Sequence, residues 1–263
     1  KKNFMIDFGS HIILDKTETW PDEVLKIINT NKENLQKFLK EERRLDLLSR
    51  ENISFRLNRP VNIYFPKWSK TIEKIENTLM KYSIVGIHAT KLIEDEINDI
   101  KENGLKPLNK VFSIKRINNI YKKGLISKEF KNKLINIEET TFNNRKGMVF
   151  VFHCLSTLKE EYGLNKLFGY WGGEAIYMHT EQPKKLEKIG TSCIVFVSIK
   201  IKELDISPEL SKRMLMHYFN DTYYPIDTDS IFYENLNVLR VVRKDDKYFE
   251  YLTEIQNWNS QLN

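Results

Sequence analysis

Apolar positions follow two different patterns along the chain, and the change lies near residue 84. Before it, apolar residues recur at intervals of three and four, as Val24, Ile27 and Ile28 do, which predicts mostly helices with one buried stripe. A further helix is predicted over 68–81 from the same spacing. Between the helices, 53–65 contains a proline and alternating apolar residues, so it predicts a short edge strand or an extended connector.

After residue 84 the pattern predicts strands mixed with helices. The apolar run 84–89 predicts a strand, followed by an amphipathic helix that begins near Thr90 and stops at Gly104. Further strands are predicted over 147–155, 169–177, 192–201 and 231–242, and a helix over 208–219. Short strands mixed with helices and loops indicate an α+β fold rather than a regular βαβ array.

Composition indicates a globular protein. The 263 residues are 41% hydrophobic and include 15 Phe and 12 Tyr, enough for a sizeable core. No apolar run approaches the ~18 residues of a membrane helix and no secretory signal is visible, so we expect no membrane partner and a cytoplasmic location. Cys154 and Cys193 lie in apolar runs, as buried free thiols of a reducing compartment do. The Cys and His residues lack metal-ligand spacing, so we expect no metal.

Positive charge is concentrated in one segment. The formal net charge is +6, and 110–133 is rich in lysine with a single acid, Glu129. Such a run is usually a solvated helical face, but clustered Lys and Arg also bind the phosphates of nucleic acids. The residues that we expect to bind nucleic acid on the second interpretation are Lys115, Arg116, Lys122, Lys123, Lys128 and Lys131.

Two short stretches carry the strongest functional signal. Val-Gly-Ile-His-Ala-Thr (85–90) and Gly-Tyr-Trp-Gly-Gly-Glu-Ala-Ile-Tyr (169–177) each set one polar residue, His88 or Tyr177, in an apolar, glycine-bearing strand pattern. Two such strands can line one cleft, and glycines let a flat ligand approach the backbone closely. A lone His or Tyr in a strand is more often an ordinary core residue, so the inference depends on their joint occurrence.

This pair of stretches resembles the first two motifs of the ADP-ribosyltransferase superfamily, in its poly(ADP-ribose) polymerase branch. The resemblance covers about residues 84–243. It implies an α+β fold with an ADP-ribosyltransferase-like split antiparallel β core and a helical N-terminal extension. The domains would be 1–82 as the extension, 83–245 as the catalytic domain and 246–263 as a C-terminal helix.

The resemblance also implies how NAD would bind as the substrate. His88 would bind a ribose hydroxyl, and the adjoining backbone at Ala89 and Thr90 would bind the nicotinamide carboxamide. Tyr177 would pack against the nicotinamide ring, with Tyr170 as a second aromatic side chain. Most members of the family have glycine where this chain has Ala89 and Ala175, and both departures leave room for a degenerate, non-catalytic cleft.

The third expected element is a catalytic Glu, which would stabilise the cationic sugar of the transition state. The best match is Glu234 in the last predicted strand. Glu174, in the Trp-Gly-Gly-Glu stretch, is its competitor, and Glu138 and Glu139 come third.

The resemblance therefore implies an NAD-dependent mono-ADP-ribosyltransferase. The basic segment favours a nucleic acid acceptor, RNA ahead of DNA, and small stand-alone enzymes of this kind are often toxins or phage-defence effectors, which would add an antitoxin protein as a partner. The alternatives are a protein-directed transferase, an RNA 2′-phosphotransferase and a non-catalytic binding module. Only Arg145, Arg240 and Arg243 could hold the 2′-phosphate of the second alternative. Phosphate-binding P-loop and Rossmann motifs and a hydrolase serine elbow are all absent from the sequence.

Overall fold

The computed structural model describes residues 6–140, 147–160, 164–204, 207–220 and 230–253. The chain divides into two compact units, and each is built from separate stretches of sequence. Unit 1 comprises Val85–Ile199 with Lys1–Gly9 and Asp227–Asn263, and unit 2 comprises Ser10–Ile84 with Lys200–Ile226.

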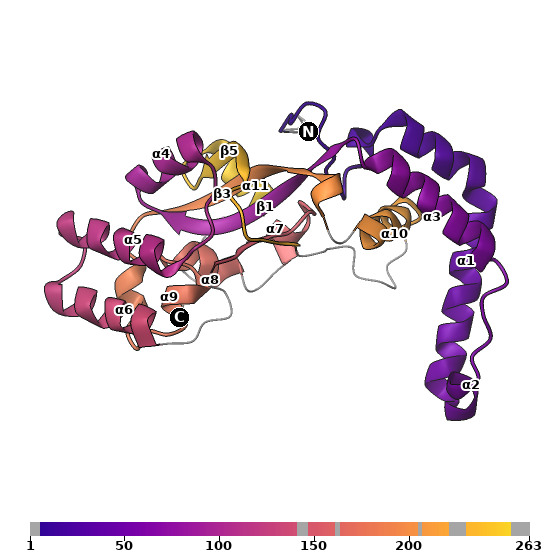
Figure 1. The fold of residues 1–263 in the computed structure, drawn as a ribbon, viewed down its shortest axis with the longest axis horizontal. Coiled ribbons are helices and arrows are strands. Elements are labelled where there is room, and N and C mark those ends of the chain that lie inside the picture. The colour runs from indigo at the N-terminus through magenta and orange to yellow at the C-terminus, as the bar shows by residue number, and fades with distance from the viewer. Residues whose placement is uncertain (1–5, 141–146, 161–163, 205–206, 221–229, 254–263) are drawn as a thin grey trace. The chain divides into compact units, whose positions relative to one another are not determined.

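Unit 2 is helical (Figure 1). Its helices are α1 (Asp22–Glu51), α2 (Ile53–Leu57), α3 (Phe65–Leu79) and α10 (Ser207–Tyr218), with short 3₁₀ turns at Thr17–Thr19 and Ile201–Glu203. α1 begins after Pro21 with acids in its first turn, which favourably oppose the helix dipole. α3 packs against both α1 and α10, and it buries Trp68, Thr71, Ile75 and Leu79, one every three or four residues.

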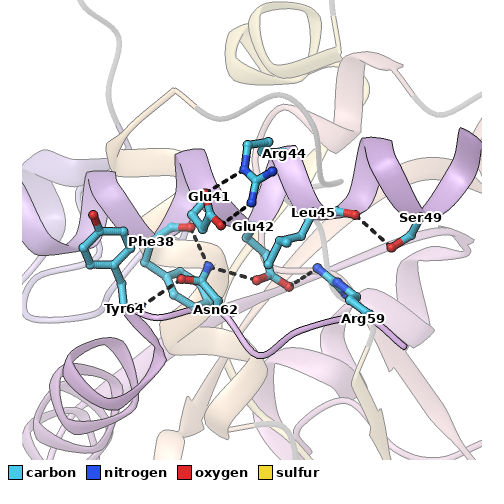
Figure 2. Close-up of polar contacts among 9 residues, drawn as sticks. All are labelled: Phe38, Glu41, Glu42, Arg44, Leu45, Ser49, Arg59, Asn62 and Tyr64. Carbon is cyan, nitrogen blue, oxygen red and sulfur yellow. Dashed lines mark hydrogen bonds and ion pairs between the residues drawn. The ribbon is translucent and has the colours of Figure 1, made fainter. Parts of the chain in front are cut away.

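The connector between α2 and α3 is held to α1 by a polar network (Figure 2). The Asn62 side-chain amide donates to the Phe38 carbonyl and to the Glu42 carboxylate, each at 3.0 Å. Arg59 donates to the same Glu42 at 2.7 Å. The expected strand over 53–65 is therefore wrong: α2 forms at its start behind the Asn52 side-chain cap, residues 58–64 form a connector that ends in a turn, and α3 begins at Phe65.

Unit 1 contains the sheets. Its helices are α4 (Glu94–Asn103), α5 (Lys110–Lys122), α6 (Lys128–Thr140), α7 (Thr157–Glu160), α8 (Leu164–Gly169), α9 (Glu174–Tyr177) and α11 (Lys247–Thr253), with a 3₁₀ turn at Pro183–Leu186. Its strands are β1 (Ser83–Leu92), β2 (Val149–Val151), β3 (Thr191–Lys200), β4 (Ser230–Phe232) and β5 (Asn237–Arg243), of which β1 and β3 each run one or two residues into unit 2.

Two small sheets result. One has the order β1-β3-β5 and the other pairs β2 with β4, and both the β3–β5 and β2–β4 pairs are antiparallel. A single antiparallel bridge between Ile87 and Phe152 links β1 to the residue after β2. The chain is thus a mixed α and β protein, as the sequence indicates, and Cys154 and Cys193 are buried free thiols.

Three of the predicted strands are wrong in extent or kind. The stretch 169–177 is a turn followed by α9, because Gly172 and Gly173 adopt positive φ angles of 97° and 68° and break the extended backbone. The strand expected over 147–155 is limited to Val149–Val151, since its partner β4 has only three residues. The strand expected over 231–242 is two strands, β4 and β5, which belong to different sheets.

The remaining predicted elements agree closely with the structure. β3, α3 and α10 lie within a few residues of their predicted bounds. The strand with the His motif extends three residues further at its C-terminal end than expected, so α4 begins at Glu94 instead of near Thr90. α4 ends at Gly104, as predicted, in a positive-φ conformation.

Candidate functional site

A cavity of about 880 Å³ lies within unit 1. Its walls come from the end of β1, the inner face of α4, the turn at 104–108, α5, β2 and the stretch 172–175. This volume falls in the range of small-molecule and cofactor sites, roughly 300–1,000 Å³. The cavity brings together His88, from the first motif, and Gly172, Gly173 and Glu174, from the second.

His88 lines the cavity with a defined orientation. Its Nδ1 lies 2.9 Å from the Phe150 carbonyl oxygen, so a neutral ring donates from Nδ1 and leaves Nε2 as an acceptor. Burial lowers the pKa of His88, the bond to Phe150 opposes this, and the nearby Arg116 lowers the pKa further. The imidazole is therefore neutral at pH 7, and Nε2 has no hydrogen-bond partner among the described residues.

The neighbouring positions on β1 serve different purposes. Thr90 and Ala89 also line the cavity. Gly86 does not provide the close approach to a ligand that the sequence suggested, because a Cβ there would lie 2.6 Å from Ile199 Cδ1 and 2.8 Å from Val197 Cγ2. The missing side chain of Gly86 is therefore required for packing against β3.

The two candidate acids differ in placement. Glu174 begins α9, is partly buried and lines the cavity. Glu234 lies in the exposed bend between β4 and β5 and is not part of the cavity wall. Glu138 is buried in α6 and also lies outside the wall, and the structure does not describe the side chain of Glu139. Of the two acids, the structure therefore places Glu174, and not the Glu234 that the sequence ranked first, at the cavity wall.

The two tyrosines do not line the cavity. Tyr177 is 7% exposed and belongs to an apolar cluster with Trp171 and residues of α5 and α6. Tyr170 packs against the same cluster, with the two tyrosine rings 5.4 Å apart. The reason is the change from strand to helix, since α9 turns Tyr177 into the core. The aromatic side chains in the wall are Phe112, Phe150 and Phe152.

A buried ion pair supports one side of the cavity. Glu96, on α4, accepts hydrogen bonds from Arg116 Nε at 2.6 Å, Trp171 Nε1 at 2.9 Å and the Ile93 backbone N–H at 2.9 Å. The Arg116 guanidinium lies over the Trp171 ring, 4.8 Å from its centroid. Glu96 and Arg116 both line the cavity, and their side chains are only 9% and 11% exposed. Lys91 fixes the adjoining stretch by donating to the carbonyls of Gly169 and Glu187.

The basic residues of α5 and α6 are not equivalent. Lys115 and Lys122 are exposed at the cavity wall, with no ion pair among the described residues. Lys123 pairs with Asp95 at 3.0 Å and lowers the pKa of that carboxyl group. On α6, Lys131 lies over the Tyr121 ring, and Lys128 lies in the first turn. Arg116 is not the surface cation that the sequence suggested.

Sequence reasoning missed the acids of α4. Asp95, Glu96 and Asp99 line the cavity at helical spacing, and Asp99 pairs with Lys106 at 2.8 Å, which lowers the pKa of the Asp99 carboxyl group. The signal available was the helix that directly follows the His motif, because its first turns must lie beside the end of β1.

In the part of the chain that the structure describes, no group of His, Cys, Asp or Glu residues has a metal-binding arrangement. Within the same residues, no helix is long and apolar enough to cross a membrane. Comparison with known proteins found no matching family model, no matching curated protein and no matching solved structure.

Proposed function

We propose that this chain is an NAD-dependent mono-ADP-ribosyltransferase whose active site is the cavity of unit 1. The supporting observation is that two motifs distant in sequence, His-Ala-Thr at 88–90 and Gly-Gly-Glu at 172–174, line the same cavity. This is what the resemblance to the superfamily requires of them.

The charges of the cavity wall suit NAD. Lys115, Arg116 and Lys122, all from α5, line the cavity and supply positive charge for a diphosphate. Glu174 supplies negative charge from a different element. A dinucleotide with an anionic diphosphate and a cationic nicotinamide ring would find complementary charge at both places.

Within this proposal the roles of the side chains follow from their chemistry. His88 accepts a hydrogen bond from a ribose hydroxyl at Nε2, because its Nδ1–H donates to the Phe150 carbonyl oxygen. The Glu174 carboxylate stabilises the positive charge that develops on the ribose as the bond to nicotinamide breaks. The acceptor hydroxyl or amine then bonds to the sugar carbon, loses its proton to solvent and completes the transfer. Phe150 or Phe112 would contact the nicotinamide ring in place of Tyr177.

The acceptor that we propose is nucleic acid, RNA ahead of DNA, because Lys115 and Lys122 at the cavity wall form no ion pair with any residue that the structure describes, and Lys128 follows on α6. In this role the chain would act as a toxin or phage-defence effector. The cavity wall has a single arginine. Arg240 and Arg243 pair with Asp246 and Glu94, and Arg145 lies outside the described residues. This disfavours a 2′-phosphotransferase, which would need several.

The experiment uses the full chain with labelled NAD and, separately, total RNA, single-stranded DNA, duplex DNA and lysate protein. We expect label on RNA, with Glu174→Gln reducing transfer at least ~100-fold because it removes charge from the transition state. Glu234→Gln is the matched control and should transfer as the wild type does. Loss of transfer in Glu234→Gln alone would reverse the assignment, and no nicotinamide release from any mixture would refute the transferase.

A further inference from the structure

Arg116 is an unusual arginine for a protein interior. A guanidinium has five N–H donors and no acceptor, yet in the described residues only the Nε–H of Arg116 has a partner, the Glu96 carboxylate. Nη2 is buried without a hydrogen-bond partner. A buried donor without a partner is destabilising, so a purely structural role would leave this side chain poorly satisfied.

The surroundings hold the guanidinium in place for an anion. Glu96 binds it from the Nε side, and the Trp171 ring lies against its face. Trp171 is fully buried, and its own N–H is committed to Glu96. With Nε and one face occupied and Nη2 buried, Nη1 is the part of the guanidinium that remains to meet a ligand, and Arg116 lines the cavity. A fixed guanidinium loses little entropy when it binds a planar or tetrahedral oxyanion.

The other charges of the wall point to more than one anionic group. Asp95 and Asp99 are neutralised by Lys123 and Lys106, whereas Lys115 and Lys122, which line the same cavity as Arg116, have no ion pair among the described residues. A single carboxylate would use one of these cations. Two adjacent phosphates would use Arg116 and at least one lysine.

We propose that Arg116 is the diphosphate-binding residue of this cavity and that its ligand is a nucleoside diphosphate or a nucleotide that contains one. This rests on the proposed function only for the identity of the full substrate, because binding of a diphosphate does not require that NAD is cleaved. Glu96 and Trp171 act as positioning residues that hold Arg116.

The test is binding of ADP and of adenosine to the full chain, measured by calorimetry in parallel with thermal melting. Arg116→Gln should weaken ADP binding at least tenfold, about 1.4 kcal/mol, and leave adenosine binding unchanged. Arg116→Lys keeps the charge without the two-pronged geometry and should bind ADP at an intermediate affinity. Arg44→Gln is the matched control, since Arg44 forms a two-bond pair with Glu41 on the surface of α1.

The outcomes separate this proposal from the transferase. Equal ADP affinity in Arg116→Gln and wild type would overturn the diphosphate proposal. An equal loss of affinity for ADP and adenosine in a folded Arg116→Lys would also overturn it, because Arg116 would then serve only to shape the cavity wall. Failure of the wild type to bind ADP would also overturn it. ADP binding that depends on Arg116 without nicotinamide release would keep the diphosphate site and refute the transferase. If nicotinamide is released and the KM for NAD is unaffected by Arg116→Lys, the transferase proposal is kept and the diphosphate-binding role of Arg116 is refuted.

Discussion

Two arginines, one in each unit, are held by acids in contrasting ways. In unit 2, Arg59 is one-third exposed, and its Nη2 pairs with Glu42 at 2.7 Å (Figure 2). The same Nη2 also pairs with Asp46 at 2.8 Å. In unit 1, Arg116 is nearly buried and uses only Nε on a single carboxylate. Arg59 fastens a connector to a helix, whereas Arg116 has donors left over beside a cavity. Both arginines have N–H groups outside their ion pairs, so what differs is where those groups lie: the Arg59 side chain is partly in solvent, whereas Arg116 Nη2 is buried without a partner among the described residues.

The largest effect should come from Glu96→Ala. This change leaves Arg116 as an unpaired buried cation and removes the acceptor of Trp171 and of the Ile93 N–H. We expect a loss of roughly 3–5 kcal/mol in the free energy of unfolding, measured by urea denaturation. Glu41→Ala, at the surface pair of α1, is the control. A loss under ~1 kcal/mol would mean that the pair is solvated like the surface one.

Trp171→Phe should have the second largest effect. A smaller aromatic ring replaces the indole, and the bond from Nε1 to the Glu96 carboxylate is lost, which adds a cost of about 2 kcal/mol for a bond to a charged acceptor to the cost of the lost volume. Trp68→Phe is the matched control, because Trp68 is also buried and stacks on Phe38 at 4.2 Å. Both are compared by urea denaturation, and equal losses would show that the bond to Glu96 contributes nothing.

Arg59→Ala should cost up to ~1 kcal/mol, because exposed ion pairs are weak and screened by salt. Glu42 retains the Asn62 amide as a donor in this variant. Urea denaturation at low and high salt should show the loss shrinking as salt is added. A loss as large as that of Glu96→Ala, and independent of salt, would remove the distinction between the two arginines.

The smallest effect is on the titration of His88. Its pKa is lowered chiefly by burial and in part by Arg116, so Arg116→Gln should raise the pKa of His88, whereas Arg59→Gln should leave it unchanged, as read from imidazole proton resonances. The folded protein binds this proton less readily than the unfolded chain. As far as His88 contributes, the free energy of unfolding is therefore highest above pH 6.5, the ordinary histidine pKa. It decreases as the pH falls from there towards the lower pKa of the folded state. A His88 pKa that is identical in the two variants would contradict the electrostatic effect of Arg116 on His88.

The sequence was sufficient to predict those elements that depend on the spacing of neighbouring residues. Apolar periodicity located α3 and α10, and Gly104 marked the end of α4, because these signals act over a few residues. It failed at 169–177, where an alternating pattern is overridden by two glycines at positive φ. A one-dimensional pattern does not reveal which glycines will take that conformation.

The site was predictable in its first strand and in part of the second motif, since Glu174 was a candidate acid and lines the cavity. His88 and Thr90 were recognised and do line the cavity. Glu96 was not, since its partners Arg116 and Trp171 lie 20 and 75 residues away in sequence. The choice between Glu174 and Glu234 likewise depends on which turn of chain returns to β1, and that is a property of the tertiary fold.

Unit 2 is made of two stretches separated by most of unit 1, and this affects its synthesis. When α1 and α3 leave the ribosome, α10 has not yet been translated, although it packs on α3 and Tyr218 donates to Asn29 of α1 at 2.8 Å. Part of the apolar face of α3 must therefore stay in water until the residues of β1 through β3 have been added. For the same reason, truncation of the protein at the start of β1 would separate α10 from α1 and α3. It would therefore divide unit 2 instead of removing a self-contained domain.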